Sequence, residues 1–136
     1  MGSQQEHFDR ARGEWECFHQ HSLALPTQAR NWRLTMAFYC ALHYLEGYLH
    51  KKSAAGQPGI PENFDAHHQR RTAMRACPEI AQNIVRAYRS LQDMSGQQRY
   101  DPSFVCTDAI VDHVTRNLNM VRSFFHCKLD PGAPGR

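Results

Sequence analysis

The sequence predicts an all-α protein, a bundle of four to five antiparallel helices. Apolar residues recur at spacings of three and four in separate stretches, which is the period of an amphipathic helix. No stretch alternates apolar and polar residues with the period of two that half-buried strands require. Glycine and proline gather between the periodic stretches, where they end helices. The 136 residues fit one domain, for which we expect a folded core over about residues 5–127 and a disordered tail over 128–136.

The first expected helix covers residues 4–21, and Pro26 prevents its continuation. Its apolar stripe consists of Phe8, Ala11, Trp15 and Phe18. Thr27 is a suitable N-cap for the next helix, which we expect to run from about residue 31 to Lys52. Its main stripe consists of Leu34, Ala37, Phe38, Ala41, Leu42, Leu45 and Leu49, and a second side is apolar as well. A helix that is apolar on most sides is normally surrounded by other helices, so we expect this one at the centre of the bundle.

A loop rich in glycine and proline follows, and Asn63 or Asp65 is expected to cap a short helix that ends near Ala76. Pro78 is expected in the first turn of a fourth helix, where its missing N–H costs nothing. The buried face of that helix should hold Ile80, Ile84, Ala87, Tyr88, Leu91 and Met94, and the pair Asp101-Pro102 should end it. The last expected helix covers residues 104–126, with a stripe of Val111, Val114, Leu118, Val121 and Phe125.

Composition restricts the classes of protein to consider. A net charge of +3 is too small to indicate nucleic-acid binding by itself, so any such site depends on local clusters of basic residues. The five cysteines are scattered and form no paired motif, which favours reduced thiols in a reducing compartment. No apolar run approaches the ~20 residues of a membrane span, and the first ten residues contain no signal-peptide core. We therefore expect a cytoplasmic protein without a membrane segment.

Three segments together resemble a known family. They are AFYCALHYLEGYL at 37–49, FDAHHQRRTAM at 64–74 and YRSLQDMSGQQRYDP at 88–102. Their order and spacing resemble HEPN-like proteins, small prokaryotic all-α domains, over roughly Trp15 to Phe125. The resemblance implies a bundle of four or five helices that is often dimeric. It also implies a toxin–antitoxin or phage-defence context, in which many members are metal-independent ribonucleases and others are partners of small nucleotidyltransferases.

The nuclease members of that family carry an arginine, four to six residues and then a histidine near the start of the last long helix. In this sequence Ser95 stands about where that arginine would be, and Tyr100 about where the histidine would be. The resemblance therefore predicts the fold and a degenerate form of the nuclease motif.

The most informative polar cluster is HHQRR at 67–71 with Arg75 after it. On a helix His68, Arg71 and Arg75 share one face, where like charges repel unless an anion offsets them. Guanidinium groups match the geometry of phosphate oxygens. The residues expected to bind phosphate or nucleic acid are His67, Arg70, Arg71, Arg75 and Arg99. The alternative is a solvated basic face whose arginines pair with Glu62, Asp65 or Glu79.

A second cluster is Arg99-Tyr100-Asp101. Tyr100 offers a hydroxyl and His68 an imidazole that titrates near neutral pH, so these two are the candidate catalytic residues. The alternative is a helix end in which Asp101 caps the last helix and Tyr100 packs on the bundle. Because Arg99 lies at the far end of its helix, we expect that only a dimer partner or a bend at Ser95-Gly96 brings it to the HHQRR segment.

Other histidines suggest metal binding or structural roles. Cys17, His19 and His21 have the form Cys-x-His-x-His, but only Cys17 and His21 share a helical face, and zinc needs three or four convergent ligands. We therefore expect no metal, and the absence of a Gly-rich phosphate loop gives no reason to expect another cofactor. His43 is expected to be a core histidine that Glu46 holds from one turn away.

The leading functional hypothesis is a HEPN-like domain that binds RNA or a nucleotide-bearing partner. If it is an enzyme, the expected reaction is RNA cleavage by the 2′-hydroxyl, with His68 as acid/base and the arginines stabilising the phosphorane. We expect a homodimer, both from the resemblance and because Trp32, Tyr44 and Tyr48 form more aromatic surface than one small bundle hides. The alternative is a non-catalytic helical interaction or dimerisation protein.

Overall fold

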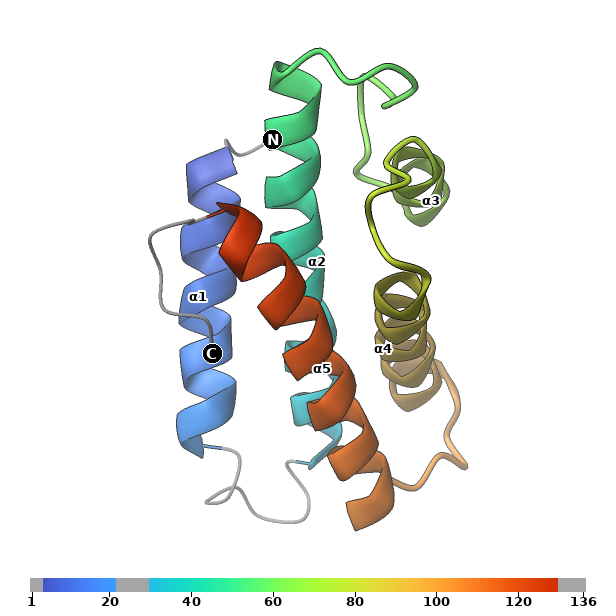
Figure 1. The fold of residues 1–136 in the computed structure, drawn as a ribbon. Helices are drawn as coiled ribbons and strands as arrows, with labels where there is room; N and C mark the ends of the chain where they lie inside the picture. The colour runs from blue at the N-terminus through green and yellow to red at the C-terminus, as the bar shows by residue number, and fades with distance from the viewer. Residues whose placement is uncertain (1–3, 22–29, 130–136) are drawn as a thin grey trace.

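The structure is a computed structural model that describes residues 4–21 and 30–129, with side chains described for 4–16 and 31–129. This part of the chain contains five helices and no strand, so the prediction of an all-α bundle is confirmed. The helices are α1 (Gln4–His21), α2 (Arg30–Ala54), α3 (His67–Arg75), α4 (Gln82–Tyr100) and α5 (Asp108–Leu129). The chain runs in opposite directions through α1 and α2, and α3 and α4 lie together on the far side of α2 from α1 (Figure 1).

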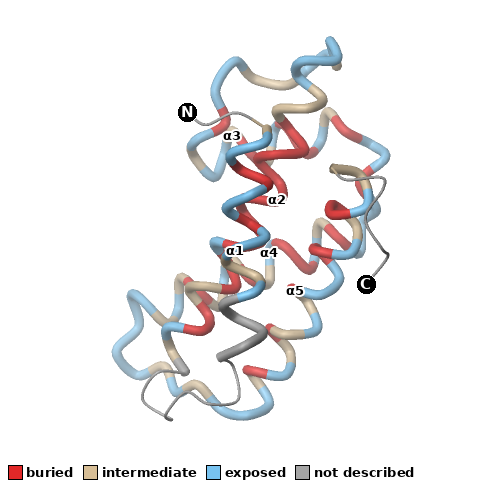
Figure 2. The backbone as a smooth tube through the Cα atoms, turned by 90° about the vertical axis from the view of Figure 1, so that its left-hand side faces the viewer, coloured by how far each residue is buried: buried red, intermediate tan, exposed pale blue. Residues whose placement is uncertain are grey.

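The centre of the bundle is α2, which contacts each of the other four helices. Every residue from Cys40 to Leu49 is buried, so this helix is covered on all sides at its middle (Figure 2). The reason lies in the sequence, because a helix with two apolar sides gains free energy only when neighbours cover both. The expectation of a central helix at 31–52 therefore agrees with the structure.

The helices α1 and α5 pack on α2 and on each other. Phe8 of α1 lies against the rings of Tyr44 and His126, at centroid distances of 6.2 and 5.6 Å. Arg122 of α5 lies over the ring of Trp15 at 4.4 Å. The expected stripe of α5 is buried throughout, at Val111, Val114, Leu118, Val121 and Phe125. Its last turn also belongs to the helix, although residues from 128 onward were expected to be disordered.

Several expected helix starts are wrong. The N-cap of α3 is Ala66 rather than Asn63 or Asp65, and its backbone N–H donates to Gln69 Oε1 at 3.0 Å. Pro78 lies in a turn closed by the bond from Ile80 N to Cys77 O, and α4 begins only at Gln82. A capping bond accompanies the first start and a backbone bond of the preceding turn accompanies the second, and helical periodicity reveals neither.

The start of α5 also differs from its prediction. The helix begins at Asp108 rather than near residue 104, and Thr107 Oγ1 accepts a bond from Ile110 N. Asp101 does not cap α5, because its carboxylate accepts bonds from Ser103 N and Ser103 Oγ, at 2.9 and 2.6 Å. It closes the turn that follows α4 instead.

Of the three aromatic residues expected at the surface, two are buried and one is exposed. Tyr44 and Tyr48 are fully buried within one chain, and Tyr48 donates a hydrogen bond to Glu79 at 2.9 Å. Burial raises the pKa of Tyr44 to about 12. Trp32 is 69% exposed. Two of the three residues offered in support of a dimer are therefore hidden by the bundle itself.

The cysteines and the hydrophobicity of the helices bear on the class of protein. Cys40, Cys77 and Cys127 are free thiols, and the side chain of Cys17 lies outside the described part of the structure. Burial holds the pKa of the Cys40 thiol well above its usual value, and its Sγ donates to Ala11 O. No helix in the described ranges is both long and apolar enough to cross a membrane.

Candidate functional site

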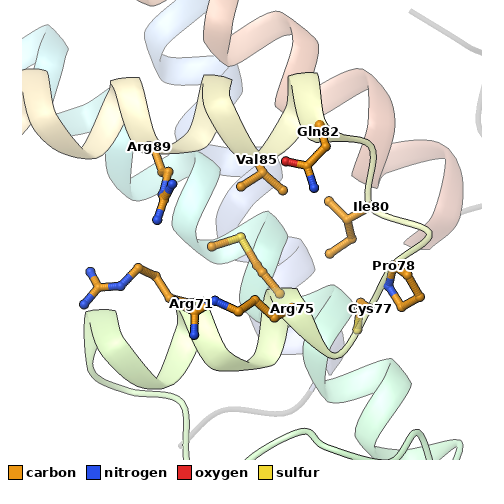
Figure 3. Close-up of a pocket in the computed structure, with 9 residues that line it drawn as sticks. Arg71, Arg75, Cys77, Pro78, Ile80, Gln82, Val85 and Arg89 are labelled. Atoms are coloured by element: carbon orange, nitrogen blue, oxygen red, sulfur yellow. The ribbon is translucent and has the colours of Figure 1, made fainter.

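Helix α3 separates two clefts. The first, here called the arginine cleft, lies between α3 and α4 and has a volume of about 410 Å³. Its lining includes Arg71 and Arg75 from α3, Arg89 from α4, and an apolar floor of Met74, Cys77, Pro78, Ile80 and Val85. Figure 3 shows Arg89 extending from α4 toward α3, Arg71 extending from the start of α3 toward α4, and Arg75 lying along α3. Volumes of about 300–1,000 Å³ are typical of small-molecule sites.

The arginine cleft carries positive charge that no carboxylate offsets. Its lining contains no aspartate or glutamate, and Arg71, Arg75 and Arg89 make no ion pair or side-chain hydrogen bond with any residue that the structure describes. The ion pairs expected under the alternative are absent from this part of the chain. Glu79 is occupied instead by Tyr48 and by Lys52, at 2.9 and 3.4 Å.

Arg89 was not among the candidate residues. The turn at 76–81 folds α4 back along α3, and Arg89 then lies opposite Arg71 (Figure 3). The relevant signal in the sequence is its spacing of four from Val85, which places both on the same face of α4. That signal shows which residues share a face but not what the face contacts.

The second cleft, here called the Tyr39–Arg99 cleft, lies between α2, α3 and α4 and has a volume of about 310 Å³. It is lined by Phe38, Tyr39, Leu42, Glu46, Asp65, His67, Arg70 and Arg99. One chain places Arg99 in the same lining as His67 and Arg70, so no dimer partner is needed to bring it to the HHQRR segment. The end of α4 is held on α2 by the bond from Thr35 Oγ1 to Gln98 Oε1, at 2.6 Å.

All three segments behind the HEPN-like resemblance contribute to this second cleft. Glu46 comes from the first segment, His67 and Arg70 from the second, and Arg99 from the third. The second segment contains two pairs of the form His-x-x-Arg, His67–Arg70 and His68–Arg71. Only the first pair is joined by a hydrogen bond, from Arg70 Nη2 to His67 Nδ1 at 2.8 Å.

Arg70 is buried, and both terminal nitrogens of its guanidinium bond to its own chain. Its Nη1 donates to the carbonyl oxygens of Phe64 and Asp65, at 3.2 and 2.7 Å, and lies 3.5 Å from Glu46 Oε1. It thereby ties the loop before α3 to α2. Among the five residues expected to bind phosphate, Arg70 is the one whose guanidinium already has carbonyl and carboxylate partners.

The bond from Arg70 also fixes the proton of His67. A guanidinium can only donate, so Nδ1 of His67 must be the acceptor and the neutral ring carries its proton on Nε2. Burial, followed by the charges of Arg70, Arg71 and Arg99, lowers the pKa of His67 below its usual value. At neutral pH this ring is therefore a hydrogen-bond donor through Nε2 and has no free nitrogen to act as a base.

Behind the Tyr39–Arg99 cleft lies a buried polar network between α1 and α2. His7 Nδ1 and His43 Nδ1 are 3.2 Å apart, His7 Nε2 is 3.5 Å from Glu46, and His43 Nε2 is 3.5 Å from Glu14. Glu46 therefore contacts His7 rather than His43, contrary to the expectation. Burial lowers the pKa of His43 to about 4 and raises that of Glu14 to about 7.

The two candidate catalytic residues lie outside both clefts. His68 is exposed on α3, and only its backbone carbonyl has a bond, from Thr72 Oγ1. Tyr100 is 78% exposed and does not pack on the bundle, while Arg99 lies over its ring at 5.2 Å. The fold thus places His68 and Tyr100 at the surface and brings His67 and Arg99 together.

Neither metal ligands within the described residues nor similar proteins identify a function for this chain. Within the described residues no group of three or more His, Cys, Asp or Glu side chains is placed to hold a metal ion. The side chains of Cys17, His19 and His21 are outside that part of the structure. Comparisons with protein-family models, curated proteins and solved structures found no match for this chain.

Proposed function

We propose that this protein binds single-stranded RNA and that the arginine cleft holds its phosphates. The observation that carries the proposal is the set of three guanidinium groups, Arg71, Arg75 and Arg89, which have no carboxylate partner among the described residues. Arginines brought together in this way repel each other, and a bound phosphate removes that cost. The apolar floor beneath them suits a ligand that is part anionic and part apolar, as a nucleotide is.

The resemblance to HEPN-like domains supports RNA as the ligand class. The proposal contains no cleavage step, because His68 and Tyr100 line neither cleft and His67 has no free basic nitrogen. Phosphate contacts fix the position of a strand without reading its sequence, so we expect weak sequence preference at the arginine cleft.

The test is fluorescence anisotropy of a labelled short single-stranded RNA between about 50 and 200 mM salt. Arg71→Ala and Arg89→Ala should each weaken binding, and each should reduce the slope of log K against log salt by about 0.7, the value for one contact on a single strand. Arg86→Ala is the matched control, since it removes the same charge from an exposed position of α4 outside the cleft.

Two results would overturn the proposal. If Arg86→Ala weakens binding as much as Arg89→Ala does, net charge rather than the cleft attracts the RNA. If the wild type does not bind RNA at the lowest salt, the arginine cleft has another ligand.

A second candidate function is self-association or docking on another protein, such as a nucleotidyltransferase-type partner. The observation that favours it is the exposure of large apolar side chains, Trp32 at 69% together with Tyr100 and Val105. Light scattering tests self-association, since a homodimer would have twice the chain mass of 15.7 kDa. Trp32→Ala should return the monomer mass if that side chain lies in the interface.

A further inference from the structure

We propose that the Tyr39–Arg99 cleft takes one unstacked base of the same RNA strand whose phosphates lie in the arginine cleft. This inference rests on the proposed function and adds what the second cleft recognises. Both clefts are lined by α3, with His67 of its first turn in one and Arg71, one turn later, in the other. His67 lines the second cleft together with Arg99, and Arg71 follows it four residues later on the same helix.

The charge of the second cleft suits a neutral base better than a phosphate. Glu46 and Asp65 both line it, and a phosphate placed there would meet their carboxylates. Arg70 does not offset a further anion, because it is already bound to two carbonyls and lies 3.5 Å from Glu46. The arginine cleft has no carboxylate in its lining, so the two clefts differ in the ligand group that each can hold.

The polar groups of the second cleft match the edge of a base. His67 presents its Nε2–H as a donor, since Arg70 occupies Nδ1. The Asp65 carboxylate is an acceptor with no ion pair or side-chain hydrogen bond to a described residue. A donor and an acceptor in one cleft can bond the Watson–Crick edge of an unstacked base, which is how proteins recognise single-stranded RNA.

The cleft also supplies a surface for stacking. Tyr39 lines it and is 39% exposed, so part of its side chain is accessible to a ligand. The buried ring of Phe38 lies behind it at a centroid distance of 5.6 Å. Stacking of a base on an aromatic side chain of this kind is tolerant of sequence and contributes strongly to single-strand binding.

The experiment compares two labelled strands by fluorescence anisotropy: a short single-stranded RNA and a strand of equal length with the same phosphates but abasic riboses. Tyr39→Leu should weaken binding of the base-bearing strand about tenfold, the scale of one lost base stack, and leave the abasic strand unchanged. Trp32→Leu is the matched control, an exposed aromatic two turns earlier on α2 and outside the cleft. Asp65→Asn should weaken only the base-bearing strand.

The outcomes separate this inference from the proposed function. Equal binding of both strands by the wild-type protein would show that the Tyr39–Arg99 cleft holds no base. The same conclusion follows if Trp32→Leu weakens binding of the base-bearing strand as much as Tyr39→Leu does. Neither result contradicts phosphate binding in the arginine cleft. If Arg89→Ala weakens binding of neither strand, the proposal for the arginine cleft is wrong, and the inference for the Tyr39–Arg99 cleft, which rests on it, is wrong as well. Unchanged binding of the abasic strand by Tyr39→Leu also shows that this variant is folded.

Discussion

The guanidinium of Arg70 donates a hydrogen bond to Nδ1 of His67 across 2.8 Å, one turn apart on α3. The same guanidinium bonds the two carbonyls that precede α3 and approaches Glu46 on the central helix. Arg71, the next residue, has no such partner among the described residues and lines the arginine cleft. One arginine therefore holds α3 in place, and its neighbour is available to a ligand.

The protonation state of His67 should follow from this bond. We expect ¹⁵N NMR to show an unprotonated Nδ1 and a protonated Nε2 at neutral pH, and a titration midpoint below 6.5. Arg70→Ala removes both the donor and a positive charge, so in that variant the midpoint should rise. A ring protonated on Nδ1 in the wild type would contradict the assignment.

Arg70 and Arg71 should differ sharply in their effect on stability. Arg70→Ala leaves Glu46 without its cation and two carbonyls without their donor, which should lower the free energy of unfolding by about 2–5 kcal/mol. Arg71→Ala removes no bond to a described residue, so the change should stay within about 0.5 kcal/mol. Urea denaturation measures both, and equal effects would show that Arg70 does not anchor α3.

Glu14 should make the protein less stable as pH rises. Burial raises its folded pKa to about 7, whereas the unfolded carboxyl ionises near 4.5. The folded state therefore binds more protons between these values, and stability falls as pH rises through that interval. Glu14→Gln has no carboxyl group to ionise and therefore does not lose stability in this way. The difference in melting temperature, variant minus wild type, should increase from pH 4.5 to pH 7. Glu16→Gln, exposed on the same helix, should show no such trend.

Truncation of a side chain at the centre of α2 should strongly lower the free energy of unfolding. Leu45 has no exposed surface, and Leu45→Ala should cost about 2–5 kcal/mol of unfolding free energy. Trp32→Ala removes a larger side chain from an exposed position of the same helix and should cost less than about 0.5 kcal/mol in the monomer. A small effect at Leu45 would argue against α2 as the central helix.

The loop before α3 should require glycine at two positions. Gly56 and Gly59 have φ angles of +84° and +86°, a region in which other residues are strained by about 1–2 kcal/mol. A Cβ at Gly59 would also lie 3.1 Å from the Cβ of Ala76, whereas a Cβ at Gly56 meets nothing within 4 Å. Gly59→Ala should therefore lower the melting temperature more than Gly56→Ala does. The reverse order would mean that the contact with Ala76 is easily relieved.

Much of the fold followed from the sequence because helical periodicity is local. The stripe from Val111 to Phe125 and the two apolar sides of α2 depend only on the spacing of residues within one helix. The start of α4 was placed too early because the turn that holds Pro78 is set by a backbone bond between Cys77 and Ile80. Tyr44 and Tyr48 were misjudged because their burial depends on α1 and α5.

The sequence by itself determined that residues 67–75 form a short basic helix, but only the tertiary structure decided what each basic residue does. Successive residues on a helix point about 100° apart, so Arg70 and Arg71 must face different neighbours. Which one meets α2 and which meets α4 depends on how α3 docks. The same docking brings Arg89 opposite Arg71 and Arg99 beside His67, pairs far apart in the chain that no local spacing connects.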